Sequence, residues 1–262
     1  MRNVILIWMS VLALRASAQV IDTAKISVNS AKKAGTIAPD TAIHINKKSG
    51  YFVAPAVLVG IGTLSFVVKP IRNFDYYVRG RIAISDPNYN SKLADYLQLS
   101  PAVLVYALNL VGDEGKDRFV DRTALIALSG GILTVTDGLK YIAHRTRPYG
   151  TDPLSWPSGH TGAAFLAAEY LNQEYGDKSP LYSILGYTVA TTTGVLRLYG
   201  RAHWFSDCVA GAGFGILSTR LAYLAYPYIR RKLTHTDKKG RSTMVMPTYQ
   251  NGAPGLVLAM QL

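Results

Sequence analysis

Long apolar stretches separated by short polar ones dominate the chain, and their lengths are typical of helices rather than strands. The first, residues 51–68, holds few polar side chains and is just long enough to span a bilayer. Most later stretches end at charged residues, glycine or proline, which stop helices. The pattern therefore predicts an all-α fold, a membrane-embedded bundle of about six main helices. The other apolar helices are expected at residues 101–111, 123–142, 161–171, 181–198 and 208–226.

The segment between the first two apolar helices is amphipathic. Within residues 71–100, aromatic and aliphatic side chains alternate with arginines, among them Arg79 and Arg81. This pattern is typical of a helix at a membrane interface, with its arginines near phosphate headgroups, and equally of an ordinary surface helix.

The beginning of the chain has the pattern of an export signal. Arg2 precedes an apolar centre at residues 4–14, and small residues at 16–18 form a cleavage site. We expect a signal peptide over residues 1–18, with an uncleaved anchor as the alternative. Either would place the protein in a bacterial cell envelope.

The remaining chain divides by composition into three parts. A polar arm precedes the apolar helices, and a basic tail follows them. Within the tail, Asn251-Gly252 between two apolar segments predicts a small hairpin. The expected boundaries are 19–50 for the arm, 51–229 for the helical bundle and 230–262 for the tail.

The charge balance narrows the class of partner. Lysine and arginine outnumber aspartate and glutamate by 28 to 16, a net charge of +12. Such a balance suits nucleic acid, an anionic membrane or a phosphorylated substrate. The basic residues are not gathered into one aromatic-interleaved patch, so we do not expect nucleic-acid binding. The single cysteine, Cys208, excludes an internal disulfide and is expected in the core.

Three short clusters contain the candidate catalytic and binding residues, and the last of them holds a histidine and a carboxylate. His203 and Asp207 are four residues apart, so on a helix they would share a face. Asp207 could then accept the imidazole Nδ1–H and leave the other nitrogen free as a nucleophile. Arg197 would converge with His203 if the helix breaks at Gly200. A plain surface ion pair is the alternative.

The middle cluster, Pro157-Ser158-Gly159-His160, precedes an apolar helix. Ser158 is a good N-cap, Gly159 allows close backbone approach, and free amides at a helix start bind anions. His160 would then lie on the first turn, beside the bound anion. A plain capping turn is the alternative.

The first cluster contributes two cations. Lys140 and Arg147 are seven residues apart, about two helical turns, so they could lie on one side of a helix that Pro148 ends. Cations closing an apolar helix could equally extend to a membrane interface.

Together the clusters are far more specific than any one of them. Catalysis of phosphoryl transfer is mainly positioning and electrostatic stabilisation. We expect His203 to attack phosphorus, while His160 protonates the leaving alkoxide and then activates water. No acidic or Cys/His cluster in the sequence has metal-ligand spacing, so no metal or cofactor is expected. The expected phosphate-binding residues are Lys140, Arg147, Arg197, Ser158 and Gly159.

These clusters resemble the signature of the type-2 phosphatidic acid phosphatase superfamily: Lys-x6-Arg-Pro, Pro-Ser-Gly-His and Ser-Arg-x5-His-x3-Asp. The match is complete except that Leu196 stands in place of the first serine of the third part. The resemblance covers roughly Tyr51 to Tyr228. It implies the same roles as the chemistry: phosphate binding by the five residues above, His203 as nucleophile, His160 as acid and base, and Asp207 as the residue that orients His203.

The family has several branches, and the apolar helices favour its membrane lipid phosphatases. The chain is similar to envelope phosphatases of the Bacteroides type. We therefore expect a metal-independent phosphatase that acts on lipid A, undecaprenyl diphosphate or phosphatidylglycerol phosphate. The alternatives are a soluble periplasmic acid phosphatase, a vanadium-dependent haloperoxidase and an inactive binding protein.

The expected location is the inner membrane, with the active site facing the periplasm; the alternative is the periplasm itself. Topology complicates this expectation. If the signal is cleaved and residues 51–68, 101–111 and 123–142 all span, Lys140 falls on the cytoplasmic side. The segment 101–111 is the first to doubt, because it is short for a span.

Overall fold

The structure is a computed structural model that describes residues 47–85, 89, 92–150, 152–236, 242–250 and 253–260. The expected signal peptide at 1–18 lies outside the described residues. So does the polar arm at 19–50, apart from its last four residues, which are helical and begin the first described helix.

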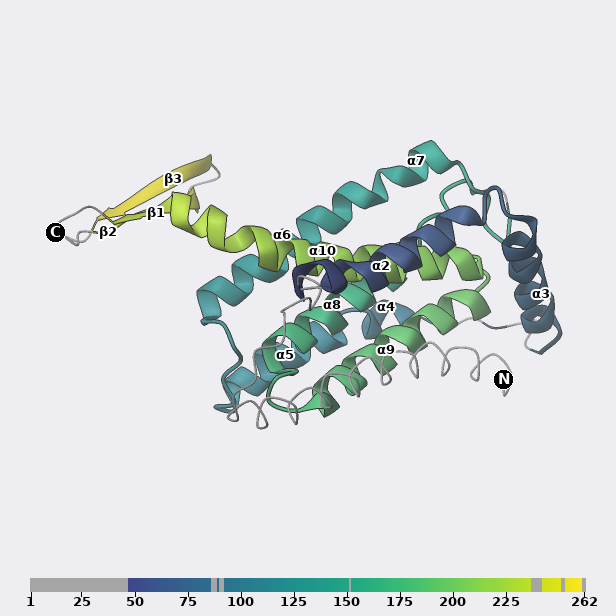
Figure 1. The fold of residues 1–262 in the computed structure, drawn as a ribbon, viewed down its shortest axis with the longest axis horizontal. Helices are drawn as coiled ribbons and strands as arrows, with labels where there is room; N and C mark the ends of the chain where they lie inside the picture. The colour runs from purple at the N-terminus through teal and green to yellow at the C-terminus, as the bar shows by residue number, and fades with distance from the viewer. Residues whose placement is uncertain are drawn as a thin grey trace, which may run out of the picture.

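Helices make up the body of the molecule (Figure 1), as the apolar pattern predicts. Six of the described helices are 17 residues or longer, which confirms the bundle of about six main helices. The helices are α2 (Lys47–Leu64), α3 (Lys69–Ser85), α4 (Leu93–Leu97), α5 (Ser100–Leu110), α6 (Phe119–Asp137), α7 (Leu139–Ala143), α8 (Gly159–Tyr175), α9 (Pro180–Tyr199) and α10 (Phe205–Leu233).

Helix α8 is the centre of the bundle, with α5, α6, α9 and α10 packed around it. Its small residues Ala164, Ala167 and Ala168 are fully buried, so neighbouring backbones can approach closely. Its two buried glutamates are each paired with an arginine, because an unpaired buried carboxylate would be costly. Glu174 accepts from Arg122 at 3.1 Å, and Glu169 accepts from Arg220 at 2.8 Å.

Glycines on α10 make its contact with α8 and α2 possible. A Cβ atom added at Gly215 would lie 2.2 Å from the Gly162 carbonyl oxygen of α8. One added at Gly213 would lie 2.7 Å from the Pro55 carbonyl oxygen of α2. Any larger residue would force these helices apart, so the small residues of this segment fix the bundle spacing.

Among the described residues, two helices are long and apolar enough to cross a membrane: Phe119–Ala143, which runs through α6 and α7, and Phe205–Arg231 in α10. Helices α2 and α3 together pass the same test but are bent by 84° at their junction. Helix α5 has 11 residues, about 16 Å of helix against a hydrocarbon core of about 30 Å. Helix α5 is therefore too short to span the membrane.

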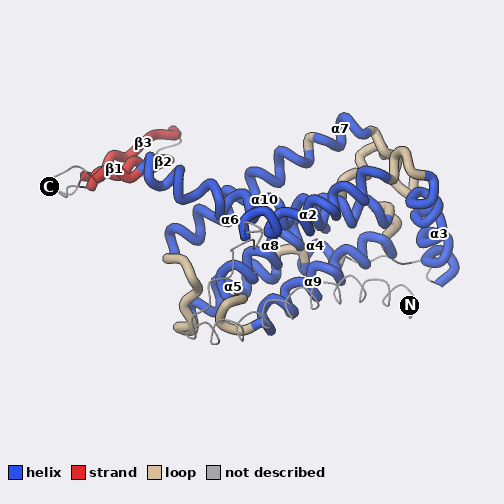
Figure 2. The backbone as a smooth tube through the Cα atoms, viewed as in Figure 1, coloured by secondary structure: helices blue, strands red, loops and turns tan. Residues whose placement is uncertain are grey.

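The basic tail forms a three-stranded antiparallel sheet beyond the end of α10 (Figure 2). Strands β2 (Ser242–Gln250) and β3 (Ala253–Met260) pair across Gln250 and Ala253, which confirms the predicted hairpin around Asn251-Gly252. A short strand, β1 (Thr234–Thr236), adds to the other edge of β2 and was not foreseen.

Candidate active site

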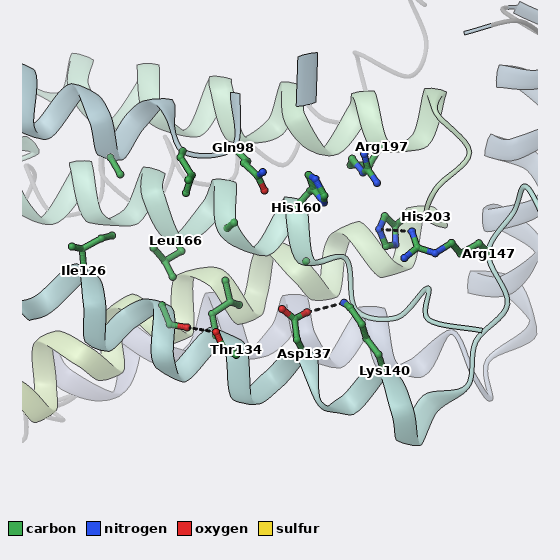
Figure 3. A pocket seen from close by; sticks show the side chains of 16 residues that line it. Gln98, Ile126, Thr134, Asp137, Lys140, Arg147, His160, Leu166, Arg197 and His203 are labelled. Atoms are coloured by element: carbon green, nitrogen blue, oxygen red, sulfur yellow. Dashed lines mark hydrogen bonds and ion pairs between the residues drawn. The ribbon is translucent and has the colours of Figure 1, made fainter. Parts of the chain in front are cut away.

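A cavity of about 580 Å³ lies between α5, α6, α8 and α9 and has two chemically different ends (Figure 3). Charged and imidazole groups gather at one end, where α8 begins and α9 finishes. The other end follows α6 and α8 and is lined by apolar side chains and Gly130. The polar end contains Asp137, Lys140, Arg147, His160, Arg197 and His203, and the apolar end contains Ile126 and Leu166. Leu99, Ala102 and Leu133 are further apolar residues of the lining.

The structure brings the three predicted cations together on this polar end. Lys140 Nζ is paired with Asp137 Oδ1 at 2.7 Å and donates to the Pro157 carbonyl oxygen. Arg147 donates to the Ala202 carbonyl oxygen at 3.1 Å. Arg197 has a buried Nε with no hydrogen-bond partner among the described residues. A buried guanidinium group with an unused donor favours an anion in the cavity.

Lys140 and Arg147 do not lie on one helix as predicted, although the predicted residues do meet at the cavity. Helix α7 ends at Ala143 and His144 is left-handed (φ 43°), so Lys140 and Arg147 do not share a helix. Helix α9 ends at Tyr199, and the turn at Gly200 brings His203 back beside Arg197, as expected. Loops therefore carry both Arg147 and His203 to the cavity.

His203 is almost completely buried, and its ring is held by a backbone carbonyl rather than by Asp207. Its Nδ1 lies 2.7 Å from the Ser155 carbonyl oxygen but 3.9 Å from Asp207 Oδ2. The carbonyl can only accept, so Nδ1 carries the proton and Nε2 keeps its lone pair. Nε2 faces Arg147 Nη1 at 3.4 Å (Figure 3). The expected direct Nδ1–Asp207 bond is therefore wrong, because His203 precedes α10 instead of lying on it.

Electrostatics keep the His203 ring neutral. Burial, reinforced by the positive charges of Arg147 and Arg197, holds the pKa of His203 well below its usual range. A ring that is neutral and protonated at Nδ1 presents a nucleophilic Nε2 to the cavity.

Asp207 contacts His203 indirectly, through Ser155. It is fully buried on the first turn of α10, where its Oδ2 accepts from Ser155 Oγ at 2.5 Å and from Trp204 N at 2.9 Å. Its Oδ1 accepts from Arg145 Nη1 at 2.7 Å. Asp207 thus fixes the Ser155 side chain, and the Ser155 carbonyl oxygen accepts a hydrogen bond from His203 Nδ1.

The Pro-Ser-Gly-His turn forms the predicted N-terminus of α8. Ser158 Oγ caps the helix by accepting from Thr161 N at 3.4 Å, while Ser158 N donates to the Asp207 carbonyl oxygen at 3.1 Å. Ser158 is buried behind the cavity wall, and Gly159 forms part of that wall. A Cβ at Gly159 would lie 3.2 Å from Asp137 Oδ1, so glycine leaves room for the Lys140 pair.

His160 lies on the first turn of α8 against a carboxylate that the sequence did not reveal. Its Nε2 is 2.9 Å from Asp95 Oδ1 of α4, and Arg197 Nη1 lies 3.8 Å from the same oxygen. A carboxylate can only accept, so Nε2 of His160 carries a proton. Burial and Arg197 lower the pKa of His160, and Asp95 opposes both effects.

Four functional neighbours were missed from the sequence: Asp75, Asp95, Arg145 and Ser155. Only Asp75 had a readable signal, because on a helix it falls on the same face as Val78 and Ile82, which are buried with it. A lone acid on the apolar face of a basic helix indicates a buried partner.

Comparison with known proteins finds one matching family model. Residues 122–231 match the model of the PAP2 superfamily, and this segment includes every predicted catalytic and phosphate-binding residue. Over this segment the chain therefore resembles the PAP2 superfamily.

A lipid A 1-phosphatase from Porphyromonas gingivalis is 36% identical over 157 residues, covering 58% of this chain and 35% of the relative. The chain thus spans about a third of the length of this curated relative. The crystal structure of Aquifex aeolicus LpxE is 18% identical with a TM-score of 0.41, covering 55% of this chain and 93% of that one. A phosphatidylglycerolphosphate phosphatase of transmembrane PAP2 type from Bacillus subtilis is 16% identical with a TM-score of 0.40, covering 71% and 98%.

The Asp95 contact gives a first prediction. Asp95→Asn keeps the shape of the side chain but removes the negative charge that raises the pKa of His160. We expect the pKa of His160 to fall further below its usual range. The measurement is a pH titration of the histidine ring signals by NMR, with His160→Gln to assign the signal.

Asp113→Asn is the control for this titration, because Asp113 pairs with Lys178 at the opposite end of α8. It should leave the His160 titration unchanged. A His160 pKa that does not fall in Asp95→Asn would contradict the described contact.

Proposed function

We propose that this protein is a metal-independent phosphatase that removes phosphate from a phosphorylated envelope lipid through a phosphohistidine. The observation that carries the proposal is the cavity itself: a neutral, buried imidazole among three cations at one end, and an apolar channel at the other. The match of residues 122–231 to the family model, the geometry and the charge distribution of the cavity all support this proposal.

In the first step, the phosphate group sits between the cations at the polar end. Lys140, Arg147 and Arg197 neutralise its equatorial oxygens, and the amides at the start of α8, where Gly159 lines the cavity, add a positive potential. Nε2 of His203 attacks phosphorus, and the phosphorus–oxygen bond to the lipid breaks in line. The proton stays on Nδ1, and the Ser155 carbonyl oxygen accepts its hydrogen bond and stabilises the positive charge formed on the ring.

His160, protonated on both ring nitrogens at this stage, supplies the proton that the leaving oxygen needs and becomes a neutral imidazole. Its Nε2–H points at Asp95 in the free protein, so this hydrogen bond must exchange for one to the leaving oxygen. In the second step, His160 accepts a proton from water, the water oxygen attacks phosphorus, and the phosphorus–nitrogen bond breaks. Inorganic phosphate leaves, and both imidazoles return to their starting states.

The apolar end of the cavity supports a lipid rather than a small soluble ester. Side chains of α5, α6 and α8 extend the cavity away from the phosphate end as an apolar surface. An acyl chain placed there would leave its phosphate beside His203. The two helices long enough to span a membrane agree with such a substrate.

Lipid A is the first substrate to test, because the curated relative is named for that reaction. We propose the inner membrane as the location, with the cavity facing the periplasm. A soluble periplasmic acid phosphatase remains the competing function, and the substrate panel separates the two.

The panel measures phosphate release, without added metal, from lipid A, undecaprenyl diphosphate, phosphatidylglycerol phosphate, phosphatidate and p-nitrophenyl phosphate. We expect turnover of a detergent-dispersed lipid to exceed turnover of the soluble ester. His203→Ala should lower it at least about a thousandfold, because the nucleophile is lost. Equal or better turnover of p-nitrophenyl phosphate would favour the soluble acid phosphatase.

The apolar end gives a separate prediction. A Cβ at Gly130 meets no atom within 4 Å, and Gly130 lines the cavity, so a leucine there would take up cavity space. Gly130→Leu should lower kcat/KM on the lipid about tenfold, the effect of ~1.4 kcal/mol of lost binding. Turnover of p-nitrophenyl phosphate should stay unchanged.

Gly131→Leu is the matched control, because Gly131 also has open space around it but does not line the cavity. Equal losses in the two glycine variants would rule out an acyl chain in this channel.

A further inference from the structure

A buried ionic cluster behind the cavity joins α3 to the catalytic loops. Its centre is Arg145, whose side chain is only 13% exposed and whose two terminal nitrogens reach two carboxylates. Nη1 lies 2.7 Å from Asp207 Oδ1, and Nη2 lies 2.6 Å from Asp75 Oδ2. Nη1 also donates to Ser65 Oγ at 3.0 Å and to Ser206 Oγ at 2.8 Å. Arg145 therefore links the α2–α3 junction, α3 and α10.

Asp75 is as completely engaged as Arg145. It is 1% exposed, and its Oδ1 accepts from Ser206 N at 2.9 Å, on the first turn of α10. Its Oδ2 accepts from Ser206 Oγ at 2.6 Å in addition to Arg145. A carboxylate that binds a first-turn amide stabilises a helix start. Asp75 thus fixes the N-terminus of α10 from a different helix.

The cluster continues without a gap to the predicted nucleophile. Asp207, held by Arg145, accepts from Ser155 Oγ at 2.5 Å, and the Ser155 carbonyl oxygen lies 2.7 Å from His203 Nδ1. Each contact fixes the next group along. Asp75 lies outside the segment that matches the family model, so α3 adds to the site from outside residues 122–231.

We propose that Asp75 and Arg145 are positioning residues for the reaction: they hold Asp207 and Ser155 so that Nε2 of His203 points at phosphorus. The inference rests on the proposed function, because it assigns His203 as the nucleophile. Neither residue lines the cavity in which the phosphate would bind. Their loss should therefore change the rate of the chemical step and leave substrate binding nearly intact.

The test compares wild type with Asp75→Asn, Arg145→Lys and the double variant. Asparagine removes the charge that Arg145 needs, and lysine cannot bridge two carboxylates. We expect kcat to fall about 10- to 100-fold in each single variant, the effect of misplacing a reacting group by about 1 Å. KM and inhibition by orthovanadate should change less than about twofold. The double variant should lose no more than the worse single variant, since both act through one path.

Glu174→Gln is the matched control. Glu174 is a buried carboxylate that binds Arg122 and Tyr223 at the opposite end of α8. Its replacement should lower the unfolding temperature by a similar amount and leave kcat unchanged. If Asp75→Asn and Glu174→Gln lose kcat equally for equal losses of unfolding temperature, the cluster is only structural and the inference is overturned.

A second readout does not require turnover. The ring nitrogens of His203, assigned with His203→Gln, should show by NMR a single tautomer with the proton on Nδ1 in wild type. They should show mixed tautomers in Asp75→Asn. If wild type releases no phosphate, the proposed function fails, and the ring signals still decide this inference: an unchanged tautomer in Asp75→Asn overturns it.

Asp75→Glu covers the case in which Asp75→Asn does not fold. Glutamate keeps the charge of the pair but displaces the carboxylate by one methylene. We expect a folded protein with a smaller kcat than wild type and an unchanged KM. Full kcat in a folded Asp75→Glu variant would count against the inference.

Discussion

The candidate site depends on one imidazole that stays neutral and keeps a fixed ring orientation among cations. His203 lies beside Arg147 and near Arg197, and these charges together with its burial hold its pKa well below the usual range. The cations that would bind phosphate therefore also keep the nucleophile unprotonated. The Ser155 carbonyl oxygen completes the arrangement, because it fixes the proton on Nδ1 and leaves Nε2 free. In the proposed mechanism, phosphate binding and activation of His203 would thus depend on the same charges.

The bundle makes this arrangement possible by burying the groups behind the site. Close contacts at Gly213 and Gly215 hold α10 against α2 and α8, so the first turn of α10 has a fixed position relative to the start of α8. That turn presents Asp207 to Ser155 and Arg145. The cavity in front of it changes from polar to apolar along α6 and α8. In the proposed complex, the ends of α6 and α8 near His203 would bind the phosphate group, and their middle would contact the acyl chain of the lipid.

The sequence predicted the fold class and the residues that meet at the cavity, but not how they meet. Apolar run lengths were enough for the helices, and the break at Gly200 was readable because Arg197 and His203 cannot share a face without it. The Nδ1 partner of His203 was misassigned to Asp207, since a backbone carbonyl such as that of Ser155 leaves no mark in a side-chain pattern. Asp95 lies on the short helix α4, and Arg145 lies in the loop after α7. Neither segment has a periodic apolar pattern that predicts where its side chains point. Their partners are tertiary contacts that only the folded chain defines.

In the proposed mechanism, phosphate passes through Nε2 of His203, and trapping the phosphohistidine would detect this transfer. Wild type and His203→Ala would be mixed with lipid substrate carrying radiolabelled phosphate, quenched within milliseconds into alkaline denaturant, and mapped by peptide. We predict an acid-labile, alkali-stable label on the peptide that contains His203, rising and decaying with turnover, and no label in His203→Ala. A label on another residue, or wild-type turnover with His203→Ala still releasing phosphate at a similar rate, would contradict the account.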